Sequence, residues 1–185
     1  RSSDLYHPTA VLETGYEILF SWVARMILMT GYGLGTIPFH TVYLHGTVRD
    51  AQGRKMSKSL GNGIDPIDVA NKFGIDAGRM ALVVGTAAGT DSKISEEKLK
   101  GYKHFANKVW NITRFITSYT NQEEYTEHLT QITHPDDVLR LNEFQDIVKE
   151  ITLEIDQYKF HIASEKIYDY IWHKLADEII ESAKI

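Results

Sequence analysis

The sequence predicts an α/β unit followed by an all-helical region. Within the first 64 residues, two short segments rich in strand-forming residues flank one segment whose apolar residues recur at helical spacing. From residue 95 onward the apolar residues recur only at helical spacing, in three successive segments. The chain has 185 residues, of which 43% are hydrophobic and 24% are charged, so we expect a folded protein and not a disordered one.

The first 64 residues have the pattern of a strand–helix–strand unit. Residues 10–15 (AVLETG) are apolar and end at a glycine, which predicts a buried strand. Residues 40–48 (HTVYLHGTV) are β-branched and aromatic, which predicts a second strand. Residues 16–31 predict a helix with a broad buried face, formed by Ile18, Leu19, Trp22, Val23, Met26 and Ile27. Two strands joined by a helix should pair in parallel.

Residues 49–85 have clear signals for a turn and a helix. Residues 49–54 (RDAQGR) predict a turn. Asp65 is a suitable N-cap, Pro66 suits the first helical position, and Gly74 suits the helix end. Residues 76–85 (DAGRMALVVG) fit either a short helix or a strand.

The remaining residues predict helices. The first follows Ser95 and presents one apolar face, formed by Leu99, Tyr102, Phe105, Ala106, Val109, Trp110, Thr113 and Ile116. A polar linker over residues 120–137 should precede two further helices. We interpret Trp110 and Trp172 as helix-packing residues. We therefore expect three parts, namely residues 1–64, a connecting region 65–94 and a helical region 95–185.

Composition excludes several classes of protein. The absence of cysteine excludes disulfides and thiolate chemistry, and the eight histidines have no metal-binding spacing, so we expect no metal site. No apolar run is long enough for a membrane span. The net charge of −5 argues against a free-standing nucleic-acid binder and against DNA as a partner. The start of the chain has neither an initiator methionine nor a signal-peptide pattern, so we expect a fragment of a cytoplasmic protein.

A loop between the second strand and the next helix has the strongest functional pattern. Residues 53–62 read GRKMSKSLGN, with Lys55 and Lys58 three positions apart between glycines. Flexible lysines in a loop that can open and close are suited to a polyphosphate. Ligands of open α/β sheets bind beyond the carboxyl ends of the strands, where this loop should lie. A merely solvated loop is the alternative, and the P-loop pattern GxxxxGK[ST] is absent.

The pentapeptide KMSKS at residues 55–59 is a signature of the class I aminoacyl-tRNA synthetases, and four longer stretches are similar to the valyl-tRNA synthetase family. They are LHGTVRDAQGRKMSKSLGNGIDP, TGYEILFSWVARM at residues 14–26, GYKHFANKVWNITRF at 101–115 and IYDYIWHKLADEIIE at 167–181. The resemblance covers nearly the whole chain. Isoleucyl-tRNA synthetases are the alternative within the class.

The resemblance implies the second half of a Rossmann-type parallel sheet and the start of an anticodon-binding domain. It implies an ATP-dependent ligase that joins valine to tRNA(Val) through valyl-adenylate, with Mg²⁺ sharing the phosphate charge. The implied catalytic residues are Lys55 and Lys58. The implied ATP-binding residues are Gly15 and Glu17 at the ribose, Leu44, His45 and Met56 at the adenine, and Ser57 and Ser59 in the loop. The implied valine pocket is walled by Ile18 and Trp22. The family commonly has an aspartate at the position of Glu17.

The other class I signature, HIGH, does not occur in the chain. We therefore expect the isolated fragment to be inactive and to self-associate through uncovered strand edges and apolar faces. A helical module that contacts tRNA without catalysis is the alternative function.

Overall fold

The computed structural model describes residues 5–57, 59–119 and 134–184. The residues fall into two compact units. Unit 1 comprises residues 1–63 and 86–93, and unit 2 comprises residues 64–85 and 94–185. The segment 86–93 therefore belongs with the first unit, although 22 residues of the second unit precede it in the chain.

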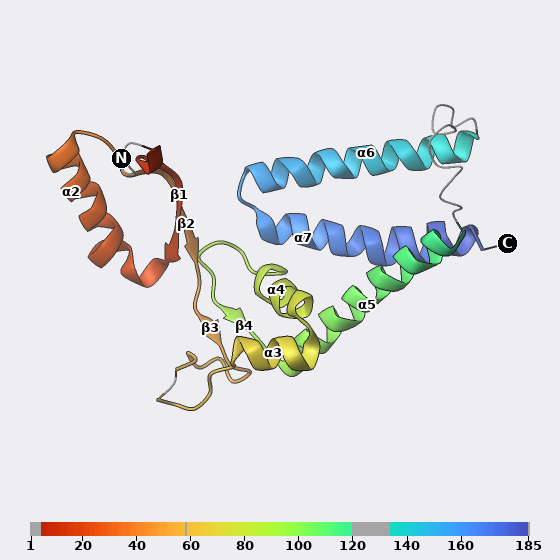
Figure 1. The fold of residues 1–185 in the computed structure, drawn as a ribbon, viewed down its shortest axis with the longest axis horizontal. Coiled ribbons are helices and arrows are strands. Elements are labelled where there is room, and N and C mark those ends of the chain that lie inside the picture. Colours follow the sequence, from red (N-terminus) through yellow and green to blue (C-terminus); the bar gives the residue numbers. More distant parts are fainter. Residues whose placement is uncertain (1–4, 58, 120–133, 185) are drawn as a thin grey trace. The chain divides into compact units, whose positions relative to one another are not determined.

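Unit 1 contains the expected strand–helix–strand motif (Figure 1). Strand β1 (Thr9–Gly15) pairs in parallel with β2 (Phe39–His45), with Thr9 opposite Phe39 and Gly15 opposite His45. Between them run the short helices η1 (Tyr16–Ile18) and η2 (Leu19–Val23) and the helix α2 (Ala24–Leu34). The prediction of a parallel βαβ unit is confirmed.

The helical segment of this unit differs from the prediction in its burial. Val23 is 1% exposed, but Ile18, Leu19, Trp22 and Ile27 are each more than two-fifths exposed. The prediction of a broad buried face is therefore wrong for this chain. Among the described residues, the sheet that β1 and β2 form has two strands, so it offers a narrow surface for the helix to cover.

A second parallel pair lies beyond β2. Strand β3 (Val48–Arg49) pairs with β4 (Ser92–Lys93), which brings segment 86–93 against the end of β2. Gly46 makes this approach possible, because a Cβ atom there would lie 1.8 Å from the Thr90 carbonyl oxygen. The predicted turn after β3 is also present, with Gly53 at a φ of +82° that glycine adopts readily.

Unit 2 begins with three helices, α3 (Pro66–Phe73), α4 (Ile75–Val83) and α5 (Glu96–Tyr119). Their core contains Phe73, Ala77, Ala81 and Leu99. The predicted cap of α3 is confirmed, because the Asp65 side chain accepts a hydrogen bond from the Ile67 amide at 2.8 Å. Residues 76–85 were predicted to form either a short helix or a strand, and most of them belong to the helix α4.

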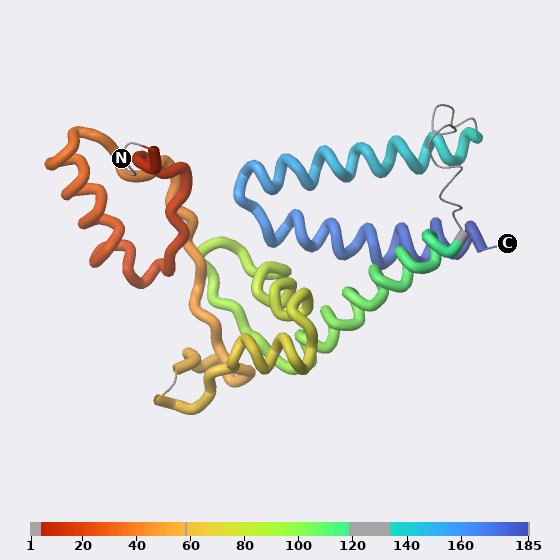
Figure 2. Tube along the Cα trace, in the orientation of Figure 1, coloured from red at the N-terminus to blue at the C-terminus, as the bar shows by residue number. Residues whose placement is uncertain are grey.

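The last elements are α6 (Pro135–Asp156), α7 (Phe160–Asp169) and a π-helical continuation, η3 (Tyr170–Ile180). The trace in Figure 2 shows α6 and α7 as antiparallel neighbours. The predicted linker extended to residue 137, but α6 already begins at Pro135. Proline suits a first helical turn. The carboxylates of Asp136 and Asp137 in that turn interact favourably with the positive end of the helix dipole. Residues 120–133 of that linker lie outside the described residues.

The two tryptophans of the helical region differ. Trp172 packs as expected, with its ring stacked on Tyr168 at 5.7 Å between centroids, and Phe105 stacks on Tyr168 at 4.6 Å. Trp110 is 66% exposed, so its interpretation as a packing residue is wrong. Trp110 lies instead on the wall of an open pocket that α4 and α7 also line. None of the described helices combines the length and apolarity that a membrane crossing requires.

Candidate functional site

The KMSKS loop and the turn after β1 meet in unit 1. The Nζ atom of Lys55 lies 2.6 Å from Oε2 of Glu17, in the first turn of η1. The other carboxylate oxygen of Glu17 accepts a hydrogen bond from the Thr47 hydroxyl at 3.3 Å. The ammonium group of Lys55 lowers the pKa of Glu17. Two segments that are 38 positions apart in the sequence thus place one cation and one anion side by side.

A single amide side chain organises the loop. Asn62 accepts a hydrogen bond from the Ser57 amide at 3.0 Å through Oδ1. Its Nδ2 donates to the Lys55 carbonyl at 3.2 Å and to Asp50 Oδ2 at 3.0 Å. The hydroxyls of Ser57 and Ser59 are 3.1 Å apart. Asn62 therefore fixes the course of the backbone on both sides of Met56.

The turn at the base of the loop is held by Asp50. Its carboxylate accepts from the backbone amide and the Nε atom of Arg54, each at 2.8 Å. The hydrogen bond from Asn62, together with those from Arg54, lowers the pKa of Asp50 to about 2. Asp50 is buried and remains ionised at neutral pH, so the turn has a fixed negative charge at its centre.

Three of the residues expected to bind the nucleotide, Gly15, Leu44 and His45, lie at the ends of β1 and β2. Gly15 stands opposite His45, and a Cβ atom at Gly15 would come within 3.3 Å of the His45 ring. The Leu44 carbonyl accepts from the Gly89 amide at 2.8 Å, and the Met56 amide donates to the Val48 carbonyl at 3.2 Å. Gly15, Leu44 and His45 thus lie at the carboxyl edge of the sheet, where ligands bind in open α/β folds.

The two residues expected to wall the valine pocket lie close behind this edge. Ile18 ends η1 and Trp22 lies in η2, so they are one helical turn apart, and both are about two-fifths exposed. Their assignment to an amino-acid pocket stays a prediction. Lys58, the second expected catalytic lysine, lies outside the described residues.

Sequence reasoning missed Asp91, a side chain of unit 1 that accepts three hydrogen bonds. Its Oδ1 accepts from the Thr47 amide at 2.7 Å and from the Tyr16 hydroxyl at 3.3 Å, and its Oδ2 accepts from Arg49 Nε at 2.5 Å. These donors lower the pKa of Asp91, the Thr47 amide most. No motif marks this position, because its partners lie 42 to 75 residues away in the sequence.

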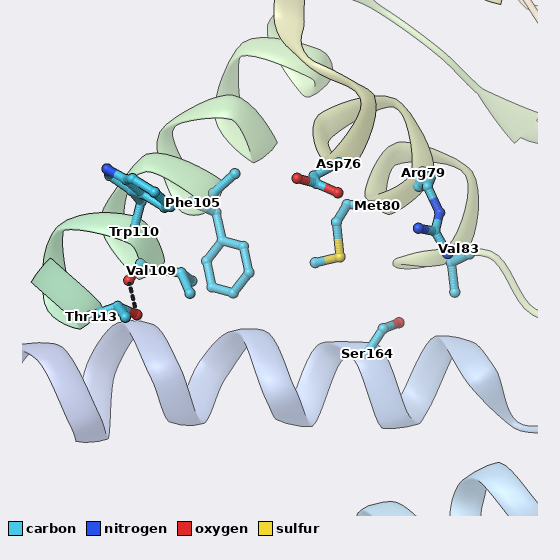
Figure 3. Close-up of a pocket in the computed structure, with 10 residues that line it drawn as sticks. Asp76, Arg79, Met80, Val83, Phe105, Val109, Trp110, Thr113 and Ser164 are labelled. Carbon is cyan, nitrogen blue, oxygen red and sulfur yellow. Dashed lines mark hydrogen bonds between the residues drawn. The ribbon is translucent and has the colours of Figure 1, made fainter. Parts of the chain in front are cut away.

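A pocket of about 520 Å³ lies within unit 2 between α4, α5 and α7 (Figure 3). Its lining is mostly apolar, with Asp76 and Arg79 contributed by α4 and Ser164 by α7. None of the expected site residues that the structure describes lies in it. Among the described residues, no group of three or more histidine, aspartate or glutamate side chains is arranged to hold a metal ion.

Two family models of tRNA synthetases match parts of the chain. Residues 1–95 match the family model of tRNA synthetases class I (I, L, M and V), and residues 137–185 match the anticodon-binding domain of tRNA ligase. The chain belongs to the class I tRNA synthetases.

Its curated relatives include three valine–tRNA ligases. Those of Clostridium acetobutylicum, Clostridium perfringens and Symbiobacterium thermophilum are 43%, 42% and 44% identical over 98%, 100% and 97% of this chain. The chain spans about a fifth of the length of these relatives.

Two solved structures are similar in fold. A ternary complex of LeuRS, tRNA and LeuAMS from Agrobacterium radiobacter K84 aligns with a TM-score of 0.71 at 23% identity, over 86% of this chain and 21% of that one. Methionyl-tRNA synthetase of Mycobacterium tuberculosis bound by methionyl-adenylate aligns with a TM-score of 0.67 at 23% identity, over 88% of this chain and 32% of that one. The predicted succession of a sheet half and a helical region agrees with these folds.

Proposed function

We propose that the chain is part of a valine–tRNA ligase and supplies the ATP-binding loop of its adenylation site. The observation that carries this proposal is the contact of Lys55, in the KMSKS loop, with Glu17, at the carboxyl end of β1. A charged loop at that edge of a parallel sheet is suited to the phosphates of a nucleotide. The identity of more than 40% with several valine–tRNA ligases supports valine as the amino acid.

The proposed reaction begins with attack of the valine carboxylate on the α-phosphorus of ATP. A new O–P bond forms as the bond to pyrophosphate breaks, and negative charge grows on the phosphate oxygens. Catalysis then depends mainly on positioning and on cations near those oxygens. Lys55 and Lys58 would supply two such cations. Mg²⁺ would arrive with the phosphates of ATP, because this ion keeps most of its waters and needs few protein ligands.

The other residues have positioning roles in this proposal. Glu17 would accept hydrogen bonds from the ribose hydroxyls once Lys55 turns to the phosphates. Gly15 would let the nucleotide approach the backbone, while Leu44, His45 and Met56 would border the adenine. Ser57 and Ser59 would shape the loop through their mutual contact. Ile18 and Trp22 would face the valine side chain.

The second step would transfer the valyl group to the terminal ribose of tRNA(Val). The match of residues 137–185 to an anticodon-binding domain supports tRNA as the partner of the helices. A protein with these substrates would work in the cytoplasm, where translation occurs. We also expect the 185-residue chain alone to self-associate, since Phe20, Leu28 and Tyr32 are largely exposed.

The experiment that tests the proposal is amino-acid-dependent pyrophosphate exchange by the full-length protein that contains these residues. Valine should support exchange, and isoleucine should support it with a kcat/KM about 10²-fold lower, because one methylene in an apolar pocket gives discrimination of that order. Lys58→Ala should lower kcat by about 10²- to 10³-fold, as removal of one charge-stabilising donor does. Preferred exchange with isoleucine would instead assign the chain to an isoleucine–tRNA ligase.

A further inference from the structure

The side chains around the Lys55–Glu17 pair are connected to one half-buried carboxylate, that of Asp91. The Tyr16 hydroxyl contacts Asp91, and Tyr16 directly precedes Glu17. The Thr47 amide also donates to Asp91, while the Thr47 hydroxyl donates to Glu17. The position of the Glu17 carboxylate is therefore set from two sides by residues that Asp91 holds.

The lysine end of the pair is connected to the same carboxylate. Arg49 donates to Asp91 through Nε, and its Nη1 donates to the Gly53 carbonyl at 3.1 Å. Arg49 also forms an isolated antiparallel bridge with Lys55. The Arg49 and Asp91 side chains are only 33% and 23% exposed, so solvent screens this ion pair less than one on the open surface.

We propose that Asp91 is a positioning residue that sets the KMSKS loop and the β1 turn at the separation required for ATP. It touches neither Lys55 nor Glu17. It acts through Arg49 on the first and through Tyr16 and Thr47 on the second. The part of this inference that concerns catalysis rests on the proposed function, whereas the part that concerns loop order does not.

Both oxygens of Asp91 are needed for this role. Oδ1 accepts from Thr47 and Tyr16, and Oδ2 accepts from Arg49. An asparagine has one acceptor oxygen and one NH₂ donor, so it would present a donor either to the Thr47 amide or to the Arg49 guanidinium. Asp91→Asn should therefore release one end of the pair without changing the volume of the side chain.

The first measurement is the rate of tryptic cleavage after Arg54 and Lys55 in the absence of ligands, followed by mass spectrometry. Cleavage requires local opening of the loop, so Asp91→Asn should accelerate it several-fold. Asp68→Asn is the matched control, because it removes the same charge from an exposed position of α3 and should leave the rate unchanged. An unchanged cleavage rate in Asp91→Asn would overturn the proposal.

The second measurement is a double-mutant cycle in pyrophosphate exchange. Asp91→Asn should lower kcat about tenfold in the wild-type background, since small displacements of positioning groups cost up to about 10²-fold. The same substitution should have a smaller effect in a Lys55→Ala background, where only its action on Glu17 remains. An equal loss in both backgrounds, or no loss in either, would show that Asp91 supports only the fold and would overturn the positioning role.

The two measurements separate this inference from the proposed function. If the wild-type protein shows no valine-dependent exchange, the proposed function fails, and the cleavage rates still decide whether Asp91 orders the loop.

Discussion

Unit 1 and unit 2 are stabilised by different interactions. Of the ten buried apolar residues among those described, only Val23 and Phe39 lie in unit 1. Unit 1 depends on two short parallel strand pairs and on carboxylates with several donors each, chiefly Asp50 and Asp91. Unit 2 has a helical core around Leu99 and an aromatic stack around Tyr168.

The difference indicates which unit contributes most apolar stability and which unit would hold the proposed adenylation site. Apolar contacts are non-directional and tolerate small shifts, whereas hydrogen bonds to a carboxylate fix the distances between specific atoms. The proposed adenylation site, which would set two lysines against a phosphate, would benefit from the second kind of interaction. Substitutions in unit 2 should therefore change mainly stability, and substitutions in unit 1 should change mainly loop order and adenylation.

The largest effect should come from Phe105→Ala in unit 2. Phe105 is 6% exposed and stacks on Tyr168, so its truncation should destabilise the unit by about 3–5 kcal/mol. Chemical denaturation followed by tryptophan fluorescence would measure this loss. Trp110→Ala, on the same helix, should cost far less because Trp110 is exposed. A similar loss in both variants would contradict the account of the core.

Gly46→Ala should be the most damaging small substitution in unit 1. The added Cβ would collide with the Thr90 carbonyl, and backbone shifts of this kind typically cost about 1–3 kcal/mol. The shift would displace Asp91, so tryptic cleavage after Arg54 should accelerate and adenylation should fall. Gly31→Ala is the control, since its Cβ would meet nothing within 4 Å. Normal loop protection in Gly46→Ala would disprove the close approach of the two segments.

A smaller effect is expected from Trp22→Ala, which tests the valine pocket. Removing this wall should admit larger side chains and raise the kcat/KM for isoleucine relative to valine at least about tenfold. Phe20→Ala, at a neighbouring position that is 88% exposed, should leave the ratio unchanged. An unchanged ratio in Trp22→Ala would remove this residue from the pocket.

The smallest effect concerns pH. The pKa of Asp50 falls from 3.8 to about 2 in the folded protein. Its contribution to the stability of the turn is therefore complete above about pH 3.8 and is lost as the pH falls through about 2. The NMR signals of the Arg54 backbone amide and the Asn62 side-chain amide should keep their folded positions at pH 3. Loss of both signals near pH 3.8 would contradict this assignment.

The sequence predicted the features that local patterns encode. The parallel unit, the turn after β3 and the cap of α3 followed from periodicity, glycine and capping residues. The burial of the segment from Ile18 to Ile27 was predicted wrongly, because burial depends on which elements pack against the helix and not on the helical spacing alone. The roles of Asp91 and Gly46 were equally hidden, since their partners come together only through the pairing of β3 with β4.

The sequence predicted residues of the candidate site but not the contacts between them, because those contacts depend on the folded chain. The KMSKS motif made Lys55 a candidate, and the family resemblance made Glu17 one, but no pattern in the sequence showed that the two side chains touch. Asn62 lies within the loop that the motif defines, yet its three hydrogen bonds depend on the folded course of the backbone.

The most direct test of the account is protection of the loop by ATP. The full-length protein is treated with trypsin with and without ATP and Mg²⁺, and cleavage after Arg54 and Lys55 is compared with cleavage after Lys149, an exposed lysine of α6. ATP should slow cleavage in the loop and leave cleavage after Lys149 unchanged. Loop cleavage that ATP does not alter, or equal slowing at all three positions, would contradict the assignment of nucleotide binding to unit 1.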